Sequence, residues 1–251
     1  MWMRRALFLI LQTLLTVKTG YAQTRLPPGF VYLRDVDASI RQDMRYATAN
    51  NFTGHRLPGY GAGECVLKQA VAHKLAAVQA DLARQNLSLK VYDCYRPMRA
   101  VHAMARWTQS GSGPDTTRFY PGLDRRRLFE LGYISGTSAH ARGVAVDLTI
   151  VPRNAAAAPA FDPQARYGSC TAPLAARAPD DSLDMGTGYD CFSPRSSTHD
   201  AGIAPAQRAS RMILWNAMKR QGFVNYKREW WHFSYPAADT RTAYDFAIAP
   251  R

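Results

Sequence analysis

Apolar residues recur at steps of three and four over residues 66–87, and this spacing predicts an amphipathic helix. Two further helices are predicted for residues 99–109 and 205–221. Pro205 suits the first turn of the last helix, and Gly222 is a typical residue just after a helix end.

Aliphatic residues alternate with small or polar ones over residues 143–151, which is the clearest strand pattern in the chain. Asp147 falls on the face opposite the aliphatic side chains. Further strands are predicted for residues 89–95 and, as a final pair, for residues 223–226 and 229–235. Helices and strands mix without a regular βαβ order, so the pattern favours an α+β fold.

Residues 1–22 predict a secretory signal peptide. Two arginines precede an apolar run over residues 6–17, and small residues lead up to a cleavage site after Ala22. We therefore expect a mature domain of residues 23–251 that is periplasmic or secreted and not stably inserted in a membrane. An uncleaved anchor is the alternative. Within the domain, residues 152–200 are rich in Ala, Pro, Asp and Ser and predict a long loop excursion.

The charge of the chain is strongly basic, with 32 Lys and Arg against 19 Asp and Glu and a net charge of +13 over 251 residues. The basic residues are scattered, and the densest run is Arg125, Arg126 and Arg127. No nucleic-acid-binding motif accompanies them, so the sequence predicts a solvated basic face and no nucleic-acid partner. Charged residues make up 20% and hydrophobic residues 47%, which is the composition of a globular protein.

The chain has four cysteines, and an even number in an exported protein suggests two disulfides. Three pairings are possible. A link between Cys170 and Cys191 would close part of the loop excursion, and it would leave Cys65 with Cys94. A zinc site made of four cysteines is the alternative, but the sequence lacks the C-x2-C pairs typical of such sites.

His140 and Asp147 form the first candidate site. His140 precedes the strand of residues 143–151, and Asp147 lies within it among residues typical of a core. A buried carboxylate is costly unless it is paired or bound to a cation. A zinc ion would meet that need, because imidazole and carboxylate are both normal zinc ligands. The alternative is an Asp147 satisfied by the backbone or an arginine, with His140 at the surface.

The second candidate site is the segment Glu229-Trp230-Trp231-His232. A carboxylate surrounded by aromatic residues has a raised pKa and suits a general base. In a regular strand Glu229 and His232 would point to opposite faces, so they reach one site only at a bulge or a strand end. An ordinary aromatic core strand is the alternative. Together with His140 and Asp147, His232 would complete three metal ligands and leave one position open, as in catalytic zinc sites.

These residues resemble a known family. The segments Ser138-x-His140-x-x-Gly143-x-x-x-Asp147 and Glu229-x-x-His232 are similar to the motifs of the D-alanyl-D-alanine metallopeptidase family. The closest resemblance is to its zinc D-Ala-D-Ala dipeptidase branch, known from glycopeptide resistance. Further matching segments cover most of the mature chain and include Tyr46-Ala47-Thr48, Asn51-Phe52-Thr53-Gly54, Tyr95-Arg96-Pro97, Phe119-Tyr120-Pro121, Met185-Gly186-Thr187 and Tyr244-Asp245-Phe246.

The resemblance implies a single α+β domain with an antiparallel sheet flanked by helices. It also implies one zinc ion per chain, held by His140, Asp147 and His232. Glu229 would be the general base that activates the zinc-bound water, and Arg96 would stabilise the oxyanion. The reaction implied is hydrolysis of the D-Ala-D-Ala dipeptide.

The substrate-binding residues implied by the resemblance are Asp190, for the free amine of the dipeptide, with Tyr46 and Ser138 nearby. A D,D-carboxypeptidase or a cell-wall endopeptidase of the same family is the nearest alternative, and it would need an open groove. The long excursion and Asp190 favour a closed pocket and a small D,D-dipeptide substrate. A non-catalytic zinc module that binds the cell wall is a further alternative, but it would have no need of Glu229 and Arg96.

Overall fold

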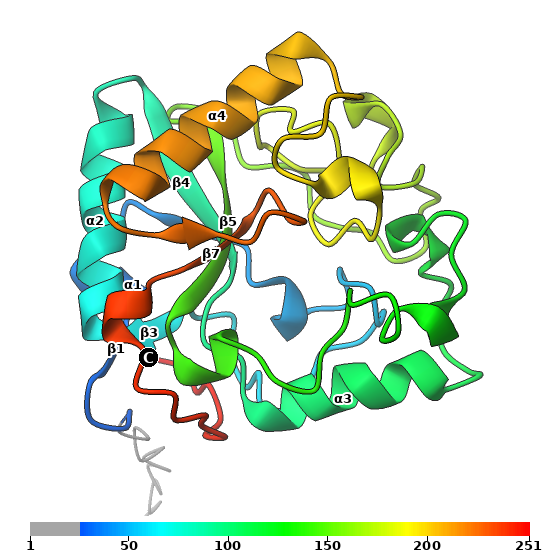
Figure 1. Ribbon diagram of the computed structural model, residues 1–251, viewed down its shortest axis with the longest axis horizontal. Coiled ribbons are helices and arrows are strands. Elements are labelled where there is room, and N and C mark those ends of the chain that lie inside the picture. The colour runs from blue at the N-terminus through cyan, green and yellow to red at the C-terminus, as the bar shows by residue number, and fades with distance from the viewer. Residues whose placement is uncertain (1–25) are drawn as a thin grey trace, which may run out of the picture.

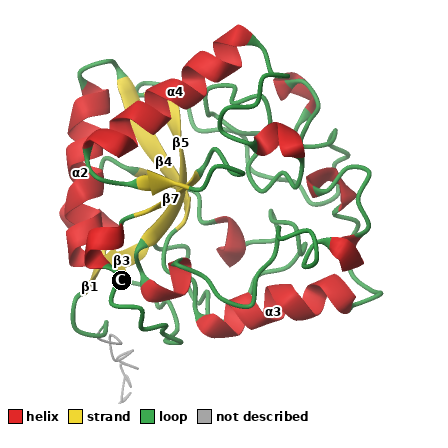
Figure 2. Cartoon of the chain, in the orientation of Figure 1, coloured by secondary structure: helices red, strands yellow, loops and turns green. Residues whose placement is uncertain are grey.

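The computed structural model describes residues 26–251, so the predicted signal peptide lies outside the described residues. The central element is a five-stranded sheet with the strand order β2-β4-β5-β7-β6. Its strands are β2 (Arg41–Gln42), β4 (Leu87–Asp93), β5 (Ala145–Pro152), β6 (Val224–Asn225) and β7 (His232–Ser234). A separate pair consists of β1 (Phe30–Tyr32) and β3 (Val66–Lys68). The strands gather on one side of the molecule, and loops occupy much of the other (Figure 2).

The α+β class predicted from the sequence is confirmed, with one correction to the sheet. Pairs β4–β5, β5–β7 and β6–β7 are antiparallel, as expected, but β2 pairs with β4 in parallel. This edge strand has only two residues, which is too short to leave a pattern of alternation in the sequence.

Helices α2 (Gln69–Ala83) and α4 (Pro205–Arg220) lie against each other and cover one face of the sheet (Figure 1). Their apolar faces pack on Val146, Leu148 and Ile150 of β5 in the main hydrophobic core. Helix α3 (Met98–Gln109) lies apart from them, in a second apolar cluster rich in aromatic residues, and α1 (Leu33–Val36) is a single turn beside β1. Among residues 26–251, no helix combines the length and the apolar character needed to cross a bilayer.

The boundaries of several predicted elements move. The helix predicted over residues 66–87 begins only at Gln69, because residues 66–68 form β3. The strand predicted over residues 229–235 is shorter, since β7 begins at His232 and Glu229 lies in the turn before it.

The excursion of residues 152–200 has the predicted loop character and covers the other face of the sheet. Lys90 of β4 forms ion pairs there with Asp180, at 2.6 Å, and with Asp181. The hydroxyl of Tyr92 donates to Asp180 at 2.8 Å, and Arg45 forms an ion pair with the same carboxylate at 2.7 Å. These charges hold the pKa of the Asp180 carboxyl below its usual range, against the effect of burial. The network fastens the excursion to the sheet.

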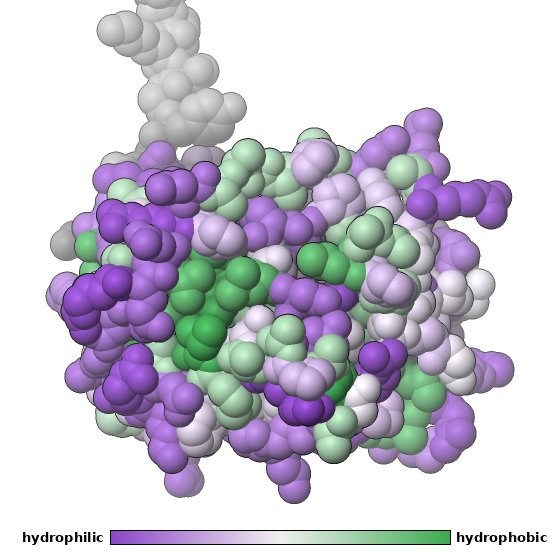
Figure 3. Space-filling view, turned by 90° about the horizontal axis from the view of Figure 1, so that it is seen from above, coloured by the Kyte–Doolittle hydropathy of each residue, from purple (hydrophilic) through white to green (hydrophobic). Residues whose placement is uncertain are grey.

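The face of the molecule that is seen from above is mostly hydrophilic (Figure 3). Its largest strongly hydrophobic area lies left of centre, and smaller hydrophobic areas lie elsewhere on this face. In the described part of the chain the large hydrophobic side chains that remain exposed are few: Phe129, Leu174, Val224 and Tyr226. Most of the large apolar side chains therefore lie in the two internal clusters.

Two disulfides cross-link the domain, and their pairing is the one that the sequence favoured. Cys65 is joined to Cys94, and Cys170 to Cys191. Cys94 directly follows β4, and Cys170 and Cys191 join two parts of the excursion. Disulfides of this kind persist in oxidising compartments.

Loss of the second disulfide should lower stability measurably. Its cysteines are 21 residues apart. A disulfide that closes a loop of that size typically raises the free energy of unfolding by about 3 kcal/mol. We expect a Cys170→Ser, Cys191→Ser double variant to melt about 6–12 °C below the wild type. Thermal unfolding followed by circular dichroism measures the difference. In a strong reductant the two proteins should unfold together, and an unchanged Tm in oxidising buffer would contradict the expectation.

Candidate metal centre and active site

Three strands bring the polar residues of the site together. Asp147 of β5 pairs in register with His232 of β7 on one side and with Asp93 of β4 on the other. His140 comes from a short 3-10 helix (His140–Arg142) just before β5. This helix ends at Gly143, which has φ 72°, and a Cβ there would lie 2.3 Å from the ring of Phe30. Glycine is thus required at the turn that carries His140 toward the sheet.

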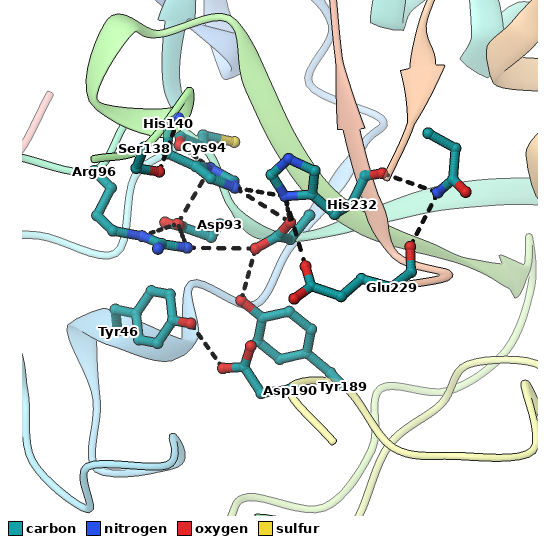
Figure 4. Close-up of polar contacts among 12 residues, drawn as sticks. Tyr46, Asp93, Cys94, Arg96, Ser138, His140, Tyr189, Asp190, Glu229 and His232 are labelled. Atoms are coloured by element: carbon teal, nitrogen blue, oxygen red, sulfur yellow. Dashed lines mark hydrogen bonds and ion pairs between the residues drawn. The ribbon is translucent and has the colours of Figure 1, made fainter. Parts of the chain in front are cut away.

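One candidate ligand atom from each of His140, Asp147 and His232 lies within 4.8 Å of the others. Figure 4 shows the rings of His140 and His232 close to each other. Asp147 Oδ1 lies 2.9 Å from His232 Nδ1 and 3.2 Å from His140 Nε2, and the two nitrogens are 3.1 Å apart. His140 and Asp147 are buried, and His232 is nearly so. Two imidazoles and a carboxylate at these separations are a candidate ligand set for a metal ion.

The hydrogen bonds around His140 favour a cation at this point. The backbone carbonyl of Cys94 can only accept, so His140 Nδ1 must donate to it, at 2.7 Å. The Nε2 atom of a neutral His140 then carries a lone pair and faces the oxygen of Asp147, which is also an acceptor. A bound cation would remove this repulsion, and a carbonyl partner of this kind is typical of metal-binding histidines.

Glu229 lies at the edge of the candidate ligand set. Its Oε2 atom is 3.9 Å from His232 Nδ1. In a regular strand Glu229 and His232 would point to opposite faces. The turn before β7 instead brings Glu229 to the same side as His232. Burial raises the pKa of the Glu229 carboxyl to about 7. For His232, burial acts to lower the pKa, but the hydrogen bond and charge of Asp147 raise it overall.

Arg96 reaches the site from the segment after β4. Its Nε atom donates to Asp93 Oδ2 at 2.9 Å, and its Nη2 atom lies 3.5 Å from Asp147 Oδ2. The guanidinium also lies over the ring of Tyr46, 4.9 Å from the centroid. Asp93 accepts a second hydrogen bond, from Tyr60 at 2.6 Å. The guanidinium is therefore held in place from two sides.

Asp190 faces the cavity from the excursion. It is buried, and Tyr46 donates to its Oδ2 atom at 2.7 Å. Burial and the nearby charge of Asp147 raise its pKa well above the usual range. Its backbone is in the left-handed region, with φ 55°, and the next residue is the disulfide-bonded Cys191. A buried carboxyl of this kind calls for a cation beside it.

Two residues of the site, Asp93 and Tyr189, were not predicted from the sequence. Asp93 anchors Arg96 and lies 3.3 Å from His140 Nδ1. The hydroxyl of Tyr189 donates to Asp147 Oδ2 at 3.1 Å. The signal for Asp93 was present, because it is an acidic residue at the end of a strand that is otherwise buried. Tyr189 had no such signal, since its contact depends on the course of the excursion.

One cavity of about 250 Å³ collects all the residues predicted for the site. These are Tyr46, Arg96, Ser138, His140, Asp147, Asp190, Glu229 and His232. Ser138 accepts a hydrogen bond from the backbone N–H of His140 at 3.2 Å, so it also supports the turn. Apolar walls complete the cavity and include Phe52, Met104, Ile134, Phe192 and Trp231. The charged groups thus face a small space with an apolar lining.

A mixed α+β domain whose cavity holds two imidazoles and a carboxylate, with a further carboxylate and an arginine beside them, has the features of a mononuclear metallopeptidase. The profile of the D-ala-D-ala dipeptidase family matches residues 27–159 and 169–248. The chain belongs to this family of metallopeptidases, which is zinc-dependent. The unmatched residues 160–168 lie in the excursion.

Individual relatives agree with the family assignment. The chain is 35% identical to a D-alanyl-D-alanine dipeptidase of Streptomyces coelicolor, over 88% of this chain and 98% of the relative. It is 31% identical to a D-alanyl-D-alanine dipeptidase of Enterococcus faecalis, again over 88% and 98%. A third, from Escherichia coli, is 28% identical over 78% of this chain and 79% of its own length.

Proposed function

We propose that this protein hydrolyses the free dipeptide D-Ala-D-Ala. The observation that carries the proposal is the single cavity that joins the candidate metal ligands and Glu229 to Asp190, in a chain of the dipeptidase family. Family membership supports the chemistry, and the small volume of the cavity, about 250 Å³, supports a short substrate. The two disulfides support action in an exported location, periplasmic or secreted.

The proposed ligands of one zinc ion per chain are His140 Nε2, Asp147 Oδ1 and His232 Nδ1. The donor set fits the ion, because its three atoms lie 2.9–3.2 Å apart and the lone pair of His140 otherwise faces an acceptor. Zinc supplies a Lewis acid that polarises the scissile carbonyl and lowers the pKa of water. Tyr189 and Arg96 hold the other oxygen of Asp147 and so orient its carboxylate.

Glu229 is the proposed general base. Its buried carboxylate accepts a proton from the attacking water and later delivers it to the leaving amine. A pKa near neutrality suits both steps, because the group must bind the proton and also release it. Trp231 and Phe192 line the same cavity and give the carboxylate apolar neighbours.

Arg96 is proposed to stabilise the oxyanion that forms on the substrate carbonyl. Its ion pair with Asp93 and its contact with the Tyr46 ring fix the guanidinium before substrate arrives. A fixed donor of this kind typically lowers the free energy of the transition state by about 3–4 kcal/mol.

Asp190 is proposed to bind the ammonium group of the dipeptide. The burial that raises its pKa would be offset by the cation, so that the carboxyl ionises when substrate binds. Tyr46 orients the carboxylate through its hydroxyl, and Ser138 adds a polar group to the same cavity.

The decisive test is the length of the substrate. N-acetyl-D-Ala-D-Ala lacks the ammonium group, and losing one partner of a buried charge pair costs about 2–5 kcal/mol. We therefore expect it to be cleaved at least tens of times more slowly than D-Ala-D-Ala, as measured by kcat/KM.

Asp190→Asn provides the matched control for this test. Asn tolerates the left-handed backbone that Asp190 adopts and keeps its size, but it carries no charge. The variant should lose most of its activity on the free dipeptide and little on the acetylated one. Equal or faster cleavage of the acetylated compound by the wild type would assign the protein to the carboxypeptidases instead.

A further inference from the structure

A second cavity, of about 50 Å³, lies beneath the excursion and is separate from the substrate cavity. We call it the arginine cavity, because Arg45, Arg118 and Arg177 all line it. Asp180 also lines it, paired with Arg45 and Lys90, and the apolar part of the wall includes Phe119, Leu174, Tyr189 and Trp230. A charge in such surroundings is poorly solvated and calls for a partner of opposite sign.

Two of these guanidinium groups keep a donor without an acceptor. The Nε atoms of Arg118 and Arg177 are buried and make no hydrogen bond to the described part of the chain. The Arg177 side chain is only 7% exposed. The Oδ1 atom of Asn50, on the same wall, is also buried and unpartnered. The Asn50 oxygen is an acceptor, so it offers nothing to an anion, and the two Nε–H groups are the free donors here.

The charges around the arginine cavity do not balance. Arg45 is paired with Asp43 and Asp180, and Arg177 is paired with Asp184 at 2.6 Å. Within residues 26–251, Arg118 has no carboxylate in ion-pair distance.

Stacking does not replace that missing partner. The Arg118 guanidinium lies over the rings of Phe119 and Phe161, 4.5 and 5.1 Å from their centroids. A ring face attracts the positive charge, but it leaves the buried Nε–H of Arg118 without an acceptor. Burial and the charge of Arg45 lower the pKa of Arg118. Arg118 is partly buried, and the charge of Asp115 acts on it from beyond ion-pair distance, so within residues 26–251 it is the one arginine of this cavity without a direct carboxylate partner.

We propose that the arginine cavity binds one small monovalent anion, with chloride as the reference ligand, between Arg118 and Arg177. One negative charge balances Arg118, and the unpartnered donors supply hydrogen bonds to it. The volume is that of a few water molecules, which suits an ion of this size. The site does not depend on the peptidase chemistry.

The position of the anion gives it a structural role. Arg118 belongs to the body of the domain, whereas Arg177 and Gly188 come from the excursion. The anion therefore joins the two. Tyr189 lines the arginine cavity, and the next residue, Asp190, lines the substrate cavity. The bound anion thus supports the segment that carries Asp190.

Thermal unfolding at constant ionic strength tests the proposal. Sodium gluconate serves as the reference salt, because gluconate is too large for the cavity. Replacing it stepwise by sodium chloride should raise the Tm of the wild type by about 3–6 °C along a saturating curve. Arg118→Gln should show little or no rise. Arg126→Gln is the matched control, since Arg126 is exposed and pairs only with its neighbour Asp124, and it should respond as the wild type does.

Diffraction gives an independent measurement that needs no variant. Crystals grown or soaked in sodium bromide should show an anomalous peak between Arg118 and Arg177. A wild-type Tm that is equal in the two salts, an Arg118→Gln variant that responds like the wild type, or a cavity without bromide would each overturn the proposal. Halide bound only at the candidate metal centre would do so as well.

Discussion

Replacing Glu229 by Gln should lower kcat for D-Ala-D-Ala by about 10²–10⁴-fold, the usual contribution of a general acid or base. The amide keeps the size of the side chain but cannot accept the proton of the attacking water. Because Glu229 lies outside the candidate ligand set, the variant should still bind one zinc ion per chain. Steady-state kinetics and metal analysis of the same sample measure both outcomes.

A suitable control for this variant is Glu130→Gln. Glu130 is exposed and forms an ion pair only with Arg127, so this change should leave kcat unaltered. If Glu229→Gln kept nearly normal turnover, Glu229 would have a structural role, and the raised pKa of its carboxyl would be a consequence of burial alone.

Replacing His232 by Ala should abolish both zinc binding and activity. The change removes one of three donors and leaves Asp147 with a single imidazole beside it. We expect zinc content to fall from about one to near zero per chain after dialysis, with no measurable hydrolysis. Metal analysis by mass spectrometry gives the first value, and an assay of released D-Ala gives the second.

His73→Ala is the matched control, because His73 is an exposed residue of α2 far from the candidate ligands in the chain. It should retain full zinc and full activity. Full zinc occupancy in the His232 variant would remove His232 from the ligand set and, with it, the proposed centre.

The parts of the fold that the sequence predicts well are those with long, regular patterns. Helix α4 and strand β5 lie within one residue or two of their predicted bounds, because each carries its apolar residues at a regular period over many positions. In the structure β5 is buried on both faces, with only its last residue exposed. Strands β1, β2 and β3 have two or three residues each and were not predicted. Their pairing depends on partners distant in the chain, which local patterns do not encode.

The candidate site was predicted from residue types and from family resemblance, and the structure brings all eight predicted residues to one cavity. Spacing alone argued against Glu229 and His232 sharing a face. The turn before β7 resolves this conflict, and turns of that kind leave little trace in a sequence. Asp93 escaped notice because its role depends on the register between β4 and β5.

Each disulfide ends beside a residue of the proposed catalytic cavity. The backbone carbonyl of Cys94 accepts a hydrogen bond from His140, and Cys191 directly follows Asp190. Each cross-link therefore constrains the backbone next to a different residue of the same cavity. A newly synthesised chain in a reducing compartment lacks both cross-links, so we expect full competence only after delivery to an oxidising one.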